Sequence, residues 1–97
     1  MTTTELLIDY GFTPNLRGYY YLKKAIDFIS TTPDDDIIAT TKILYPALGL
    51  TFDTSEASIE RAIRYSIAMN DSEKIKRIKK PTNTTIIMLL AEIKRDS

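Results

Sequence analysis

Residues 52–69, FDTSEASIERAIRYSIAM, contain the clearest helical pattern of the chain. Ser55 or Thr54 is a suitable N-cap, and Asp53 with Glu56 three residues later offers a capping box one step earlier. Small and apolar residues then recur three and four positions apart, the spacing of the buried face of an amphipathic helix. The pattern therefore predicts a capped helix over about residues 55–69, whose buried stripe is Ile59, Ala62, Ile63, Ser66 and Ile67.

The outward side of this helix carries polar and charged side chains. Ser58, Arg61 and Tyr65 lie on one flank, and Glu60 and Arg64 lie on the next. One interpretation is a solvated surface, on which Glu60 and Arg64 form an i,i+4 ion pair worth about 0.2–0.5 kcal/mol. The other interpretation is a contact surface for a second molecule, and the spacing is compatible with both.

The preceding residues predict a helix packed against this one. The acidic run PDDD at 33–36 stands before the apolar segment IIATTKIL, where acids favour a helix N-terminus; adjacent carboxylates diverge, so capping is favoured over a metal site. Pro46 is expected to interrupt that helix and to start a short new one, PALGLT. With Gly49 allowing close approach, the short helix, the turn and the capped helix form a helix-turn-helix unit over about residues 45–69.

Helical spacing continues on both sides of this unit. TTTELLIDY predicts a short first helix that ends at Gly11, and residues 16–29 predict a second with one apolar stripe. We interpret the tyrosines at 19–21 as core or core-edge residues rather than as a platform for stacking bases. Pro81, Thr82 and Asn83 stop one element and cap a last helix, whose apolar face is Ile86, Ile87, Leu90 and Ile93.

No segment alternates cleanly at period two, so the predicted fold class is all-α. A chain of 97 residues is long enough for one core, and we expect a single compact domain over residues 1–97 with five or six helices.

Composition narrows the function classes. The chain contains no cysteine and no histidine, which removes thiolate chemistry, the usual zinc ligands and the side chain that titrates near neutrality. We therefore expect no catalytic residues, no metal and no cofactor, and an enzyme is the least favoured class. The longest apolar run, IIMLLA at 86–91, is too short to span a bilayer, so we expect no membrane partner and a cytoplasmic location.

The formal charge of zero conceals an uneven distribution. Residues 1–57 carry four basic and eight acidic side chains, whereas residues 58–97 carry nine and five. A basic half suits a polyanionic partner, although a set of solvated helix faces would give the same composition.

Three segments together resemble one family. LRGYYYLKKAI, TKILYPALGLTFDTSEASIERAIR and KKPTNTTIIMLLAEIK are similar, in that order, to the C-terminal effector domain of the sporulation initiation (stage-zero) response regulator family. The similarity runs from about Glu5 to Lys94. It implies a six-helix DNA-binding domain that activates or represses transcription, with the RAIR helix in the major groove.

The resemblance also implies which side chains read bases. Glu60, Arg61 and Arg64 match groove-facing positions, and Ser58 and Tyr65 stand where the family commonly has arginine and histidine. Arginine can bond the O6/N7 edge of guanine with two hydrogen bonds, and a carboxylate can accept from cytosine N4. The expected base contacts are therefore Ser58, Glu60, Arg61, Arg64 and Tyr65.

Phosphate contacts are expected at two places. Thr54 and Ser55 precede the RAIR helix, and Lys79 and Lys80 end the run KIKRIKK at 74–80, which holds five basic side chains and no acid. The expected partner is double-stranded DNA. A homodimer on DNA, with a contact from the last helix, and binding to a full-length regulator or RNA polymerase are further candidates.

Three departures from the family limit the resemblance. Only fifteen residues, 65–79, separate RAIR from KPTN, so one helix is expected to be truncated or lost, and we expect no receiver domain within the chain. Ser58 and Tyr65 replace two groove-facing family residues, and this loss, together with the formal net charge of zero, supports an alternative function. The alternative function is a protein-interaction module, or an antagonist, that kept the fold and pairs with a full-length regulator.

Overall fold

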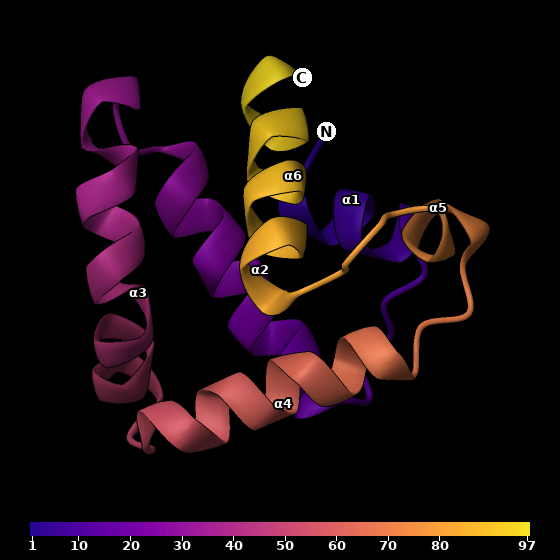
Figure 1. Cartoon of the computed structure of the whole chain (residues 1–97), viewed down its shortest axis with the longest axis horizontal. Helices are drawn as coiled ribbons and strands as arrows, with labels where there is room; N and C mark the ends of the chain where they lie inside the picture. Colours follow the sequence, from indigo (N-terminus) through magenta and orange to yellow (C-terminus); the bar gives the residue numbers. More distant parts are fainter.

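The computed structural model describes residues 1–97 as six α-helices and one 3-10 turn (Figure 1). The elements in chain order are α1 (Thr3–Asp9), α2 (Arg17–Ser30), η1 (Asp34–Asp36), α3 (Ile37–Phe52), α4 (Glu56–Ala68), α5 (Glu73–Lys76) and α6 (Asn83–Asp96). The all-α prediction is confirmed. No helix is long and apolar enough to cross a membrane.

The core is built around α2, which packs against α1, α3, α4 and α6. In Figure 1, α3 stands on one side of α2, α6 lies in front of it and α4 runs across the lower end of the molecule. The predicted stripe of α4 is largely buried, since Ile59 and Ile63 have no exposed surface. The central buried side chains from α1, α2, α4 and α6 are Leu6, Leu7, Leu22, Ile26, Ile59, Ile63, Ile86, Ile87 and Leu90.

Local signals predicted most helix ends correctly. Gly11, just after α1, has φ +88°, a conformation that glycine adopts without steric cost. Thr82 caps α6 by accepting a 3.2 Å hydrogen bond from the N–H of Thr85. Of the three consecutive tyrosines, Tyr19 and Tyr21 are buried, whereas Tyr20 is half exposed, so two of the three are core residues.

The predicted break at Pro46 is wrong, because α3 continues through it from Ile37 to Phe52. The pyrrolidine nitrogen removes one hydrogen bond of the helix. Leu44 and Leu48, one on each side of Pro46, are both buried, and packing of an apolar face stabilises a helix beyond its local propensity. The first helix of the helix-turn-helix unit is therefore a 16-residue helix rather than a short one.

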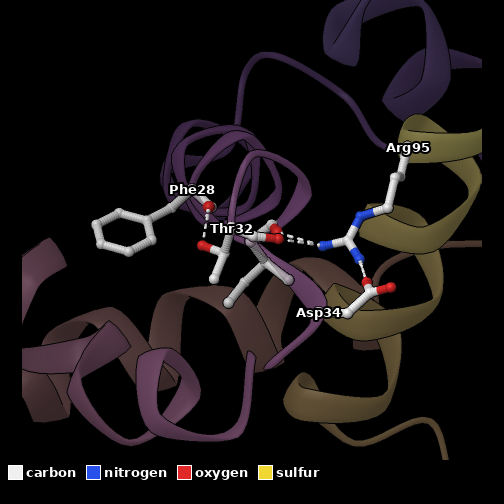
Figure 2. A network of polar contacts seen from close by, with 5 residues as sticks. Phe28, Thr32, Asp34 and Arg95 are labelled. Carbon is white, nitrogen blue, oxygen red and sulfur yellow. Dashed lines mark hydrogen bonds and ion pairs between the residues drawn. The ribbon is translucent and has the colours of Figure 1, made fainter. Parts of the chain in front are cut away.

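The predicted side-chain cap from the acidic run is also wrong. Asp34–Asp36 form a 3-10 turn, and Asp36 occupies the N-cap position of α3 without a side-chain hydrogen bond. Asp34 instead pairs with Arg95 at the far end of the chain (Figure 2). Arg95 also donates to the carbonyl oxygens of Ile29, at 2.9 Å, and Thr32, at 2.8 Å. One guanidinium thus holds the junction between α2 and α3.

The short segment after α4 contains one short helix, and its truncation relative to the family stays a prediction. α5 has only four residues, of which Ile75 is buried. Lys74 reaches back to α1, where its Nζ lies 2.6 Å from Asp9 and 4.8 Å from the ring centroid of Tyr10. The hydrogen bond to Asp9 raises the pKa of Lys74. Lys74 is therefore paired within the protein, and Asp9 partly offsets its charge.

Candidate nucleic-acid interface

A tight turn joins α3 to α4. Asp53, at φ 51° and ψ 53°, adopts the left-handed conformation that ends α3, and the N–H groups of Asp53 and Thr54 both donate to the carbonyl of Gly49. A Cβ atom at Gly49 would lie 2.8 Å from the carbonyl oxygen of Thr54. Glycine is therefore required where the two helices meet, as the sequence predicted.

Ser55 is the N-cap of α4. Its Oγ accepts a 3.1 Å hydrogen bond from the N–H of Ser58, and the two serine hydroxyls lie 2.9 Å apart. The alternative capping box is not formed, because Asp53 terminates α3 and its backbone is not extended as an N-cap requires. The start of α4 is thus fixed at Glu56.

The outward face of α4 is open to solvent. At about 100° per residue, Arg61 points almost directly away from the buried stripe, and Arg64 and Tyr65 lie on either side of it. All three side chains are exposed, and Arg61 makes no hydrogen bond or ion pair. Arg64 Nη1 lies 3.2 Å from Glu60 Oε1, so the predicted i,i+4 pair is formed.

The flank of α4 that carries Glu60 and Arg64 faces the start of α6. Asn83 Nδ2 donates a 3.0 Å hydrogen bond to the carbonyl of Glu60, which ties the two helices together. Between them lies an open hollow of about 420 Å³, lined by Tyr45, Glu60, Arg64, Pro81, Thr82, Asn83 and Thr84. Partial burial raises the pKa of Tyr45, and the side chain of Asn83 offsets part of that effect.

A comparison with known families identifies this arrangement. Residues 3–93 match the model of the family described as sporulation initiation factor Spo0A C terminal. The chain belongs to this family. Domains of the Spo0A C-terminal family bind DNA and regulate transcription in sporulation. The chain is accordingly a DNA-binding regulator.

Within this Spo0A-type domain, the residues predicted to read bases lie together on α4. Four of them are exposed: Glu60, Arg61, Arg64 and Tyr65. Ser58 is half-buried, and its hydroxyl is hydrogen-bonded to the hydroxyl of Ser55. They form one surface, whose contacts with bases remain a prediction.

The residues predicted to touch phosphate lie at two places on the Spo0A-type domain. Thr54 and Ser55 are in the turn before α4. Lys79 and Lys80 are exposed, make no ion pair and lead directly into the residues that line the hollow beside Arg64. Lys80 has φ 52°, so the chain turns sharply before α6.

Sequence reasoning missed Tyr45 and the link from Asn83 to α4. Both residues lie in segments that carried the resemblance, LYP and KPTN, but nothing in their spacing indicates that they meet. Tyr45 is on α3 and Asn83 begins α6, and only the packing of both helices on α4 places them in one hollow.

Proposed function

We propose that this domain is a sequence-specific transcription regulator that places α4 in the major groove of double-stranded DNA. The observation that carries the proposal is the exposed Arg61, which points away from the core and has no partner within the protein. An α-helix fits the major groove, where an arginine can recognise guanine through two hydrogen bonds. Such a regulator acts on the chromosome, which agrees with the expected cytoplasmic location.

The other proposed base contacts follow from their place on α4. Arg64 and Glu60 form an ion pair at 3.2 Å. On DNA, Arg64 can leave this pair to bind the edge of a guanine, and Glu60 can then accept from the amino group of a cytosine. Tyr65 presents a phenol that is 55% exposed, and Ser58 a short hydroxyl. Because the latter two differ from the commoner family residues, we propose an operator that differs at the base pairs facing them.

The proposed phosphate contacts border the same helix. Thr54 and Ser55 lie at its start, and Lys79 and Lys80 lie beside the hollow next to Arg64. From family membership alone, we propose a homodimer on paired half-sites and a contact with RNA polymerase as further parts of this function.

Selection from random duplexes, followed by anisotropy titration at fixed salt, tests the proposal. Wild type should recover a shared motif. Arg61→Ala and Arg64→Ala should each lose about 1–3 kcal/mol of discrimination at one base pair and retain much of their affinity for scrambled duplexes. Ser58→Arg should change the preferred base next to the position read by Arg61.

Phosphate contact is measured separately, by the salt dependence of binding. Replacing Lys79 and Lys80 together with alanine should weaken binding to selected and scrambled duplexes alike and flatten the salt slope by up to about two units. An unchanged slope would return both lysines to an ordinary solvated surface. A wild-type protein without sequence preference would contradict groove reading.

A second candidate function is supported by the outward face of α3. Ala39, Ile43, Pro46 and Leu50 follow one another at intervals of four, three and four residues, and all are exposed, Leu50 at 86%. Apolar residues at this spacing suit a partner helix. We propose, as the alternative, an antagonist that pairs with a full-length regulator through this face. Binding to such a regulator that is lost in Ile43→Ser and Leu50→Ser, without any DNA preference, would favour it.

A further inference from the structure

A second open hollow lies between the start of α2 and the turn that precedes α4. Its volume is about 440 Å³, and it is separate from the hollow beside Arg64. Tyr21 and Phe52 meet there in an edge-to-face contact with ring centroids 4.8 Å apart. The lining residues are Arg17, Tyr20, Tyr21, Phe52, Asp53 and Thr54.

The start of α2 is held close against α4 by Gly18. A Cβ atom at this position would lie 2.2 Å from the carbonyl oxygen of Ala62 and 2.1 Å from Ser66 Oγ. At about 100° per residue, Ala62 lies on the side of α4 that leads to Ser58 and Tyr65, opposite the side of Glu60 and Arg64. Arg17, the neighbour of Gly18, therefore borders the flank of α4 that the start of α6 does not cover.

Side chains suited to phosphate gather in this hollow. Arg17 is exposed and makes no hydrogen bond or ion pair within the protein. Tyr20 is 49% exposed, and Thr54 adds a second hydroxyl. A guanidinium and neighbouring hydroxyl groups commonly donate hydrogen bonds to the oxygens of a DNA phosphate. Asp53 is the one acidic residue of the lining, and its charge would oppose the anion.

We propose that Arg17, together with Tyr20 and Thr54, binds a backbone phosphate on the DNA strand that borders the Ser58 and Tyr65 flank of α4. This inference rests on the proposed function, since it assumes that α4 lies in the groove. A helix with side chains is about 10–12 Å across and the major groove about 12 Å wide, so residues on both sides of α4 meet opposite phosphate walls. Lys79 and Lys80 are proposed for one wall, and Arg17 serves the other.

The test is the salt dependence of binding measured with Arg17→Ala. Removing one phosphate contact should flatten the slope by about one unit and weaken binding roughly five- to tenfold at low salt, equally for selected and scrambled duplexes. Arg17→Lys should keep the slope. Lys24→Ala is the matched control, because Lys24 is an exposed base on the same face of α2, two turns farther from the hollow, and its loss should leave the slope unchanged.

Asp53→Asn tests the hollow without removing a contact. Asparagine tolerates the left-handed conformation, so the turn is retained while the negative charge is lost. Affinity for all duplexes should rise severalfold, and the rise should be smaller when Arg17→Ala is also present. Circular dichroism of each variant checks that the helices are intact.

The outcomes separate this inference from the proposed function. An unchanged slope in Arg17→Ala, in a protein where Arg61→Ala loses discrimination at one base pair, overturns the role of Arg17 and leaves groove reading in place. A slope that depends on Arg17, in a protein without sequence preference, supports the phosphate contact and contradicts groove reading. A slope that falls equally in Arg17→Ala and Lys24→Ala overturns the inference, because the effect would then be general charge.

Discussion

Neighbouring residues of α4 have different roles, because some of their side chains point into the core and others point to solvent. Ile63 has no exposed surface, and its two sequence neighbours are the partly exposed Ala62 and the exposed Arg64. Apolar burial contributes about 25 cal/mol per Å², whereas an exposed ion pair contributes at most about 1 kcal/mol. Stability should therefore depend on the inward residues and partner binding on the outward ones.

Ile63→Ala should lower the free energy of unfolding by about 2–5 kcal/mol, because it leaves a cavity between α4 and α2. Ser58→Ala should change it by less than about 0.5 kcal/mol, since Ser55 still accepts from the N–H of residue 58. Urea denaturation of both variants measures the difference. Equal losses would mean that α4 faces the core by another side.

Tyr45 predicts a specific alkaline response. Burial raises the pKa of its phenol, so the folded state favours the protonated form more than the unfolded state does. Its contribution to stability is complete below the unfolded pKa of about 10 and is lost as pH rises through the folded value. Tyr45→Phe should reduce the fall in urea midpoint between about pH 9 and pH 11. A wild-type slope in this variant would contradict the assignment.

At the scale of an element, α3 carries a removable defect. Pro46 is exposed and lies inside the helix, where it leaves the carbonyl of Lys42 without its usual N–H donor. Pro46→Ala should therefore stabilise the protein, by up to about 3 kcal/mol, with a higher melting temperature. Ala47→Gly, one residue along, should destabilise the protein by about 1 kcal/mol, which measures how strongly stability depends on helix propensity at this place in α3. Destabilisation by Pro46→Ala would show that the proline is needed for the path of α3.

The helices differ in how far their local sequence determines them. The stripe of α4 and the caps at Ser55 and Thr82 were predictable, because each depends on residues within one or two turns. Continuation through Pro46 was not, since it depends on the burial of Leu44 and Leu48 against other helices. Asp53 presented a capping-box spacing, but the approach of Gly49 to Thr54 assigns it to the end of α3 instead.

For the candidate site, sequence spacing and family resemblance indicated the arginines of α4 but not their surroundings. Lys74 pairs with Asp9, 65 residues away, so one member of the basic run serves the fold. Arg17 lies beside the proposed DNA-binding surface only because α2 packs closely against α4 where Gly18 meets Ala62. Contacts between residues so far apart in the chain leave no periodic trace in the sequence.

At the scale of the whole molecule, Arg95 joins the last helix to the junction of α2 and α3 (Figure 2). Its side chain is only 21% exposed, whereas Asp34 is 85% exposed. The two carbonyl acceptors, on Ile29 and Thr32, therefore matter more than the ion pair, because an exposed pair is screened by water. Since α3 begins just after this junction, the clamp also fixes the first helix of the helix-turn-helix unit.

Arg95→Ala should lower the free energy of unfolding by about 1–3 kcal/mol, because the carbonyls of Ile29 and Thr32 lose a charged donor in a partly buried place. Asp34→Ala should cost less than about 1 kcal/mol, and the double variant should resemble Arg95→Ala. Lys94→Ala is the control for loss of a neighbouring positive charge and should be close to neutral. Denaturant titration of wild type, Arg95→Ala, Asp34→Ala and the double variant gives the coupling energy. If Asp34→Ala costs as much as Arg95→Ala and the two effects are fully coupled, the ion pair rather than the carbonyl clamp holds the junction, and the helix-turn-helix unit should then loosen with added salt.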